Sequence, residues 1–156
     1  MTGNWRFLFV EVQGRISRKG FWNGTLILLA VYLSIFVTLL AFWSDDFLAE
    51  PSALWIRRLT FGTDVLLAWP AFAVTAKRQH DRGQRPWLAW TGLVTTLGYS
   101  ALELAGYTET AAGLTTLGMA ALSLMVIFVV FVVIELGIRK GTPGVNAYGP
   151  DPLEAS

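Results

Sequence analysis

The sequence predicts an all-α integral membrane protein in which four helices cross the bilayer as a bundle. Three observations favour this fold. First, 54% of the 156 residues are hydrophobic and only 15% are charged, whereas soluble domains average about 25% charged residues. Second, uncharged stretches recur along the chain at the length of a membrane crossing, about 20 residues. Third, the seven tryptophans fit a protein with two water–lipid boundaries, where amphipathic rings gather.

Residues 1–19 precede the first uncharged stretch and combine polar with aromatic side chains. Their apolar positions follow the i, i+3, i+4, i+7 spacing of one helix face: Trp5, Leu8, Phe9 and Val12. We expect a short helix that lies in the membrane interface with this face in the headgroups. The alternative is a terminus without regular structure. A signal peptide is not expected, because the apolar run that follows is too long and has no small-x-small cleavage site. We therefore interpret that run as a retained span.

The first span is expected at about residues 21–43. The stretch from Gly20 to Ser44 holds no charge and is longer than the roughly 20 residues that cross a bilayer core. Trp22 and Trp43 stand near its two ends, as interface anchors would. Acidic residues and a proline then end the span: Asp45, Asp46, Glu50 and Pro51.

The second span, at about residues 59–76, is the least apolar of the four. Its interior carries Asp64 and Pro70. A proline inside a helix removes one backbone hydrogen bond and produces a kink, which neighbouring helices tolerate in a membrane. Because ionisable groups inside a membrane are costly, Asp64 is a candidate functional residue. The alternative is an ion pair between Asp64 and one of the arginines at the entry of the span, Arg57 or Arg58.

Two further spans are expected at about residues 87–105 and 112–138. Pro86 is well placed for the first turn of a helix, and the stretch that follows carries no charge until its last turn. The fourth stretch is an unbroken apolar run between charged flanks, which is typical of a lipid-facing helix. The tail, residues 139–156, is too rich in glycine and proline for a regular helix or strand. The chain is thus expected to form a single membrane domain.

The charges predict how the chain is threaded. With four spans, the polar segments alternate between the two sides of the membrane. Ten of the twelve Lys and Arg residues then fall on one side, and only Arg57 and Arg58 fall on the other. The positive-inside rule assigns the ten to the cytoplasm. We therefore expect both termini and the loop Lys77–Trp87 in the cytoplasm, and the acidic loops on the outer side.

The loop Lys77–Trp87 holds the only histidine of the chain, His80, which Asp81 follows. A metal site of the histidine–aspartate hydrolase type would need several further histidines, and neighbours at i and i+1 point apart on a helix. The sequence contains no nucleophile elbow, phosphate-binding glycine loop or dinucleotide fingerprint. We expect no enzyme activity, cofactor or metal. His80 and Asp81 are instead expected to cap the second span and pair with arginines such as Arg78 or Arg82.

Two basic clusters, Arg15–Lys19 and Lys77–Arg85, suit anionic lipid headgroups, since each cation near an anionic surface contributes about 1 kcal/mol. The alternative is that they set the topology alone. Nucleic acid is not expected as a partner, because these segments are short and tethered to a membrane. The small-residue spacings Gly20-x-x-x-Gly24 and Gly137-x-x-x-Gly141 permit close helix approach. A homo-oligomer or a membrane-protein partner therefore stays open.

Three motifs together resemble a known family. Residues 14–22 read Gly-Arg-Ile-Ser-Arg-Lys-Gly-Phe-Trp, residues 78–83 read Arg-Gln-His-Asp-Arg-Gly, and residues 144–152 read Gly-Val-Asn-Ala-Tyr-Gly-Pro-Asp-Pro. In this order they are similar to the YhaH/YhaI-like group of small bacterial inner-membrane proteins, a domain of unknown function. The resemblance implies a four-helix inner-membrane protein with no established activity. This chain departs from the group at Gln79, where an apolar residue is usual, and at Arg85-Pro86, where Ser-Gly is usual.

The motif positions all fall where the threading places the cytoplasmic face: Arg15, Arg18, Trp22, Arg78, His80, Asp81, Trp87, Asn146, Tyr148 and Gly149. We expect Asn146 and Tyr148 to fold back onto the central loop and the Arg15–Arg18 turn, forming one polar cluster that also includes Arg82. This cluster is expected to stabilise the bundle and to dock anionic lipid or a protein partner. Two other functions remain open, a small transporter or channel component and a lipid-active enzyme that uses His80 and Asp81.

Overall fold

The computed structural model describes residues 4–49, 54–110 and 113–154, and the side chains of all of these except residues 42–49. Several residues that entered the expected span boundaries lie outside this description. They are Glu50, Pro51 and residue 112, together with the side chains of Trp43, Asp45 and Asp46.

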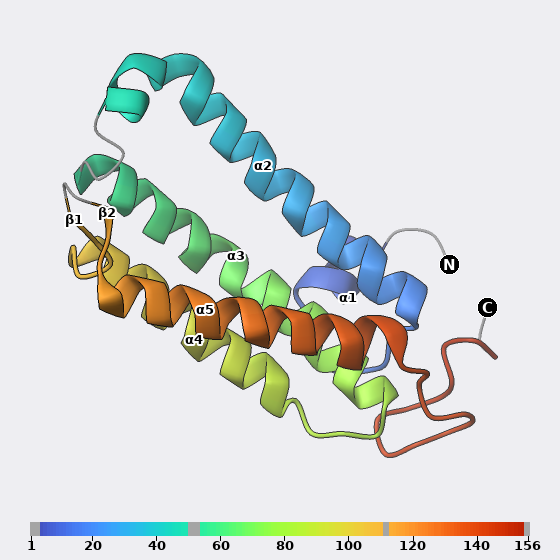
Figure 1. Ribbon diagram of the computed structural model, residues 1–156. Helices are drawn as coiled ribbons and strands as arrows, with labels where there is room; N and C mark the ends of the chain where they lie inside the picture. Colours follow the sequence, from blue (N-terminus) through green and yellow to red (C-terminus); the bar gives the residue numbers. More distant parts are fainter. Residues whose placement is uncertain (1–3, 50–53, 111–112, 155–156) are drawn as a thin grey trace.

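The described part of the chain is mostly helical. Its elements, in order, are α1 (Trp5–Phe9), α2 (Arg18–Ala49), α3 (Leu54–Asp81), α4 (Trp87–Leu104), β1 (Glu109–Thr110), β2 (Gly113–Leu114), α5 (Thr116–Val132) and the π-helix η1 (Val133–Ile138). The two short strands form an antiparallel hairpin that pairs Glu109 with Leu114. Helices α3, α4 and α5 pack side by side, and α2 contacts α3 and η1 near its own first residues (Figure 1).

Three helical segments are long and apolar enough to cross a membrane: Arg18–Ala41, Leu54–Asp81 and Thr116–Ile138. Most large apolar side chains of α2 and α5 face outward, as Leu124 does with 67% of its surface exposed. Contiguous exposed apolar surface of this kind indicates contact with lipid, so the expected helical membrane protein is confirmed. Helix α4 has 18 residues, about 27 Å at 1.5 Å per residue, and it is not among these three segments, so the fourth expected span is not confirmed.

The helix boundaries differ from the expected spans at three places. Helix α2 continues to Ala49, α3 continues from Leu54 through Pro70 to Asp81, and α5 begins only at Thr116. At the start of α5, the hydroxyl of Thr115 accepts a hydrogen bond from the amide of Gly118 at 3.0 Å. Capping of this kind determines where a helix begins. An uncharged stretch of sequence indicates only which part of the helix lies in lipid, so it does not predict the helix boundary.

Helix α1 is shorter than the apolar face that predicted it, and Val12 lies beyond its end. Trp5 is exposed, but Leu8 and Phe9 pack against the main core cluster. That core lies where α2 begins, and it contains Phe21, Val74, Leu88 and Leu136.

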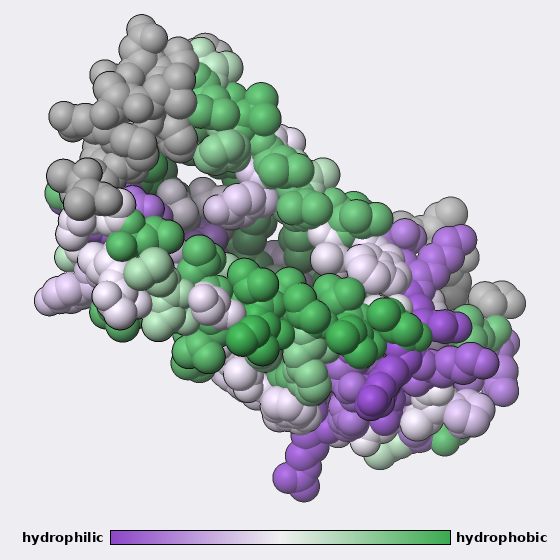
Figure 2. All heavy atoms as spheres, in the orientation of Figure 1, coloured by the Kyte–Doolittle hydropathy of each residue, from purple (hydrophilic) through white to green (hydrophobic). Residues whose placement is uncertain are grey.

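Helices α2 and α3 meet closely at Gly24, where an added Cβ would lie 3.0 Å from a methyl group of Val74. Hydrophilic residues gather at this same end of the molecule, around the tail, next to a hydrophobic band over α5 (Figure 2). The polar residues that the motifs single out are therefore held at one end of the helices.

Candidate functional site

Asp81, the last residue of α3, lies between two arginines. Its Oδ1 accepts hydrogen bonds from Arg15 Nη2 at 3.0 Å and from Arg15 Nε at 3.2 Å, and its Oδ2 accepts one from Arg78 Nη1. All three residues are buried, with 6% of Arg15, none of Arg78 and 3% of Asp81 exposed. A buried charge without a partner costs several kcal/mol, so each of these groups depends on the others.

The same arginine connects the start of the chain to its end. Arg15 Nη1 donates to the carbonyls of Gly144 at 2.7 Å and Gly149 at 3.1 Å, and Nη2 donates to that of Thr142 at 2.6 Å. Thr142 also bonds to the carbonyl of Asp81, through its amide at 2.8 Å and its hydroxyl at 2.9 Å. The tail is therefore held against the end of α3, although it contains no regular helix.

His80 is enclosed by the tail on one side and by the N-terminal segment on the other. Its ring stacks on Tyr148, with the ring centroids 4.0 Å apart and the planes 5° apart, and its Nδ1 lies 3.2 Å from the carbonyl oxygen of Gly14. Asn146 donates to the backbone carbonyl of His80 at 2.9 Å and accepts a hydrogen bond from the amide of Tyr148 at 2.8 Å. Only 7% of His80 is exposed.

We call this group of residues the Asp81 cluster: Arg15, Arg78, His80, Asp81, Thr142, Asn146 and Tyr148. In the described part of the chain, no three His, Asp or Glu side chains lie together where they could hold a metal ion. Within the cluster, the side chains of Arg15, Arg78, Asp81, Thr142 and Asn146 are engaged with one another and with backbone groups. Such a network gives rigidity and a single arrangement of the segments that it joins.

Five successive carbonyls at the end of η1, those of residues 135–139, each accept a hydrogen bond from a side chain elsewhere in the fold. The donors are Arg82, Arg78, Trp22 and Arg18. The last carbonyls of a helix have no partner within the helix, and cations near that end are favourable because it carries partial negative charge. The end of η1 is thus capped from α2 and α3 rather than by its own sequence.

Glu135, in η1, pairs with two arginines. Its carboxylate accepts a hydrogen bond from Arg82 and forms an ion pair at 2.9 Å with Arg139, one turn later. The second pair follows from the i, i+4 spacing of the sequence. The first, over 53 positions of the chain, depends on how α3 and η1 pack.

Two buried polar residues at the end of α3, Lys77 and Gln79, were not predicted as site residues. Lys77 Nζ donates to the carbonyl of Leu8 at 3.0 Å and to that of Glu11, which fixes the N-terminal segment. Gln79 Nε2 donates to the carbonyl of Arg85 at 3.0 Å, and its Oε1 accepts from the amide of Ala89 at the same distance. Gln79 thus caps α4, whose own N-cap residue offers no side-chain hydrogen bond. The only available signal was its departure from the family pattern.

Residues 77–81, which the sequence analysis treated as part of a loop, are the last five residues of α3. Lysine, arginine and glutamine are good helix formers. Lys77 bonds to the N-terminal segment, Arg78 to the end of η1 and Gln79 to the start of α4. Because these contacts depend on how the segments pack, neither the helical state nor the burial followed from the local pattern.

The remaining predicted residues lie at the margin of the Asp81 cluster or away from it. Arg18 is exposed, and Trp87 is half exposed, with its ring 6.3 Å from that of Phe131 in α5. Asp64 lies nearer the start of α3, away from the cluster, and its carboxylate accepts a hydrogen bond from the hydroxyl of Ser100. It lines a small, mostly apolar crevice of about 220 Å³ between α3, α4 and α5.

Comparison with known proteins places the chain in a family. A family described as "Protein of unknown function (DUF805)" matches residues 9–150, which include the first two motifs and most of the third. The uncharacterised protein YiiR of Escherichia coli, from strain K12 and from O157:H7, is 33% identical over 148 residues, covering 94% of this chain and 87% of the relative. No solved structure matches. Because the match extends over nearly its whole length, the chain belongs to the DUF805 family of proteins of unknown function.

Proposed function

We propose that this chain is a non-enzymatic, multi-pass protein of the bacterial inner membrane. In this proposal, the Asp81 cluster holds the helices together at the cytoplasmic face and presents a surface that docks anionic lipid or a protein partner. The three ordered motifs favour the YhaH/YhaI-like group within its family. The observation that carries the proposal is the position of Asp81 between Arg15 and Arg78, which joins three distant segments at one end of the fold.

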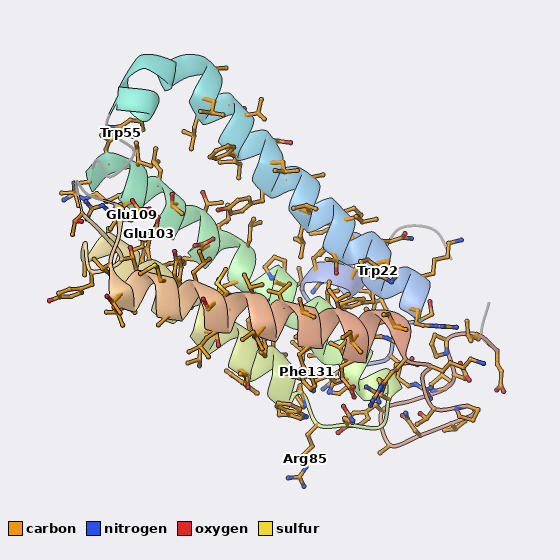
Figure 3. The ribbon with its side chains drawn as sticks, in the orientation of Figure 1. Trp22, Trp55, Arg85, Glu103, Glu109 and Phe131 are labelled. Carbon is orange, nitrogen blue, oxygen red and sulfur yellow. The ribbon has the colours of Figure 1, made fainter. Side chains whose placement is uncertain are left out.

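The distribution of charge supports four crossings with both termini in the cytoplasm. Arg85 lies at the end of the molecule that carries the Asp81 cluster, whereas Glu103 and Glu109 lie at the opposite end (Figure 3). Helix α4 connects these two ends and packs against α3. The positive-inside rule assigns the arginine-rich end to the cytoplasm, and α4 is then the fourth crossing.

The surroundings of His80 support a role other than catalysis. A general base must reach the proton that it removes, but this imidazole is stacked on Tyr148 and faces the carbonyl of Gly14. Asp81 is likewise engaged by two guanidinium groups. An acid–base pair that acts on a lipid headgroup would require both side chains to be open.

The topology can be tested with single cysteines, because the sequence contains none. We expect a membrane-impermeant maleimide to label Glu109→Cys in intact spheroplasts. Arg85→Cys and Lys140→Cys should be labelled only after the membrane is opened. Labelling of Glu109→Cys and Arg85→Cys from the same side would exclude α4 as a crossing.

Docking can be tested by native mass spectrometry after extraction in a mild detergent. The wild-type protein is expected to retain an anionic phospholipid or a protein partner, and the cluster-breaking variant Arg78→Ala is expected to lose it together with thermal stability. A wild-type protein that carries neutral lipid alone and no partner would contradict docking.

A transporter component is the second candidate, and the crevice between α3, α4 and α5 is the observation that favours it. Asp64 and Thr96 are polar residues of its lining, and ionisable residues inside a membrane often mark ion or proton pathways. Reconstituted vesicles should then show a proton flux that Asp64→Asn abolishes while the melting temperature stays unchanged. The absence of any flux in the wild-type vesicles would remove this candidate.

A further inference from the structure

A second polar feature lies beside the Asp81 cluster. A cavity of about 740 Å³ opens between the start of α2, the end of η1 and the tail. Its lining includes Ser17, Arg18, Lys19, Trp22, Lys140 and Leu153. Ligand sites in proteins commonly have volumes of roughly 300–1,000 Å³, so this cavity, which we call the basic pocket, is large enough for a lipid headgroup.

The basic pocket has positive charge that the protein does not neutralise. Arg18 donates only to the carbonyl of Ile138, at 3.3 Å. Lys19 and Lys140 form no hydrogen bond or ion pair with any residue that the structure describes. These three exposed cations therefore differ from Arg15 and Arg78, which are buried and engaged.

The two carboxylates that line the basic pocket are already occupied. Asp81 is bonded to Arg15 and Arg78. Asp151 accepts hydrogen bonds from the amides of Gly144 at 3.1 Å and Leu153 at 2.9 Å. The backbone amides leave the charge of Asp151 in place, but the cations of the lining, Arg18, Lys19, Arg78 and Lys140, outnumber the two carboxylates, so the pocket attracts anions.

The start of α2 adds to this attraction. The helix has 32 residues and begins at Arg18, so its positive end lies at the basic pocket. Amide groups at such an end favour phosphate and other anions. The helix end and the three cations thus select the same kind of ligand.

The basic pocket also lies next to surface that suits an acyl chain. Trp22 borders it, and Leu26 and Leu29 follow at the i, i+4 and i+7 positions of the same helix face. Leu26 is 55% exposed and Leu29 is 49% exposed. When the phosphate of a phospholipid lies in the pocket, its acyl chains can lie on this outward-facing apolar surface. A soluble phosphate ester has no acyl chain to contact it.

We infer that the basic pocket binds the phosphate group of an anionic phospholipid, with Arg18, Lys19 and Lys140 as its cationic contacts. This inference rests on the proposed function, since it assigns the docked lipid to a particular site. A zwitterionic headgroup carries a positive charge of its own, which the three cations of the pocket repel. We therefore expect the pocket to bind phosphatidylglycerol more tightly than phosphatidylcholine.

Binding can be measured by native mass spectrometry of the detergent-solubilised full chain, titrated with dioleoyl phosphatidylglycerol or dioleoyl phosphatidylcholine. The wild-type protein is expected to prefer phosphatidylglycerol. Removing two cations in Lys19→Gln/Lys140→Gln should weaken that binding about 30-fold, at roughly 1 kcal/mol for each cation. An equal affinity of the wild type for both lipids would overturn the inference.

The matched control is Arg6→Gln/Arg85→Gln, which removes two charges expected on the same membrane face but outside the basic pocket. Arg6 is 73% exposed in its side chain, and Arg85 points away from the protein (Figure 3). The control variant should bind phosphatidylglycerol within about threefold of the wild type, because charges outside the site act only through screened attraction. An equal loss in the two double variants would mean unspecific adsorption and would overturn the site.

Two further arms separate the remaining outcomes. Soluble glycerol 3-phosphate should bind far more weakly than the lipid, and an equal affinity would overturn a lipid as the source of the phosphate. The melting temperatures of both double variants should match that of the wild type.

If Lys140→Cys labels from outside, the proposed function fails. If labelling is as proposed but Lys19→Gln/Lys140→Gln still binds normally, the pocket inference alone fails.

Discussion

Arg15 Nη2 lies 3.0 Å from Asp81 Oδ1, although the two residues are 66 positions apart in the chain. Arg15 stands in the turn before α2, and Asp81 ends α3. The other donors of Arg15 reach the carbonyls of the tail. One guanidinium group thus joins three segments that are distant in the chain: the turn before α2, the end of α3 and the tail. The integrity of this end of the fold should depend on that single contact more than on any surface ion pair.

Replacing Asp81 with asparagine should destabilise the protein by about 3–5 kcal/mol, because Arg15 and Arg78 would stay buried without a counter-charge. Denaturation in sodium dodecyl sulfate, followed by circular dichroism, measures this change. The control is Glu11→Gln, which removes the exposed 4.0 Å contact with Arg6, where less than about 1 kcal/mol is expected. Equal effects of the two changes would show that Asp81 contributes no more than a surface group.

Gln79, near the end of α3, and Gln84, in the loop that follows, allow a paired test. Gln79→Leu should cost about 1–3 kcal/mol, because the carbonyl of Arg85 and the amide of Ala89 lose a buried partner. Gln84→Leu should be neutral or stabilising, since the Oε1 atom of Gln84 is buried without a hydrogen bond. Hydrogen exchange at the amide of Ala89 should quicken in the first variant only. A faster exchange in both variants would argue that the loop, rather than the cap of α4, was disturbed.

Gly141 is expected to tolerate no side chain. A Cβ at this position would lie 2.7 Å from the carboxyl carbon of Asp81, so Gly141→Ala should displace Asp81 and lower the melting temperature. Gly98, inside α4, has no atom within 4 Å of its added Cβ. Gly98→Ala should therefore raise stability by about 0.5–1 kcal/mol through helix propensity. The prediction fails if both variants melt like the wild type.

The stacking of Tyr148 on His80 predicts slow chemical modification of the only histidine. Tyr148→Ala should expose the imidazole and speed its reaction with diethyl pyrocarbonate roughly 3- to 10-fold, in line with the strength of an aromatic pair. Peptide mass spectrometry measures the modified fraction at His80. Tyr107→Ala removes an exposed ring at the opposite end of the molecule and should leave the rate unchanged. The same fast rate in wild type and variant would contradict the enclosed histidine.

Three of the four expected spans overlap helices that are long and apolar enough to cross a membrane, because hydrophobicity is a local property of the sequence. The gap in charge between Gly20 and Ser44 predicted the lipid-facing part of α2. The helical state of residues 77–81 was not predicted, because charged side chains at the end of an apolar run ordinarily mark a loop. Here they find buried partners in the N-terminal segment and the tail.

The glycine pairs show the same limit. Gly20-x-x-x-Gly24 and Gly137-x-x-x-Gly141 left an oligomer open, yet in the structure Gly24 faces Val74, Gly137 faces Trp22 and Gly141 faces Asp81. The spacing indicated close approach correctly, but the approaching group belongs to the same chain. A spacing of small residues therefore predicts a close contact but does not identify the segment that makes it.

Composition and charge order were enough to predict a helical membrane protein, because the cost of placing charge in lipid acts on each stretch of chain separately. The residues of the three motifs came from the resemblance to a known family. Packing alone determined that Asp81 would pair with Arg15, that Gln79 would cap α4, and that four side chains would bond to the last carbonyls of η1. These contacts join residues up to 120 positions apart. Their energy comes from burying matched polar groups together, and that match exists only once the helices have assembled.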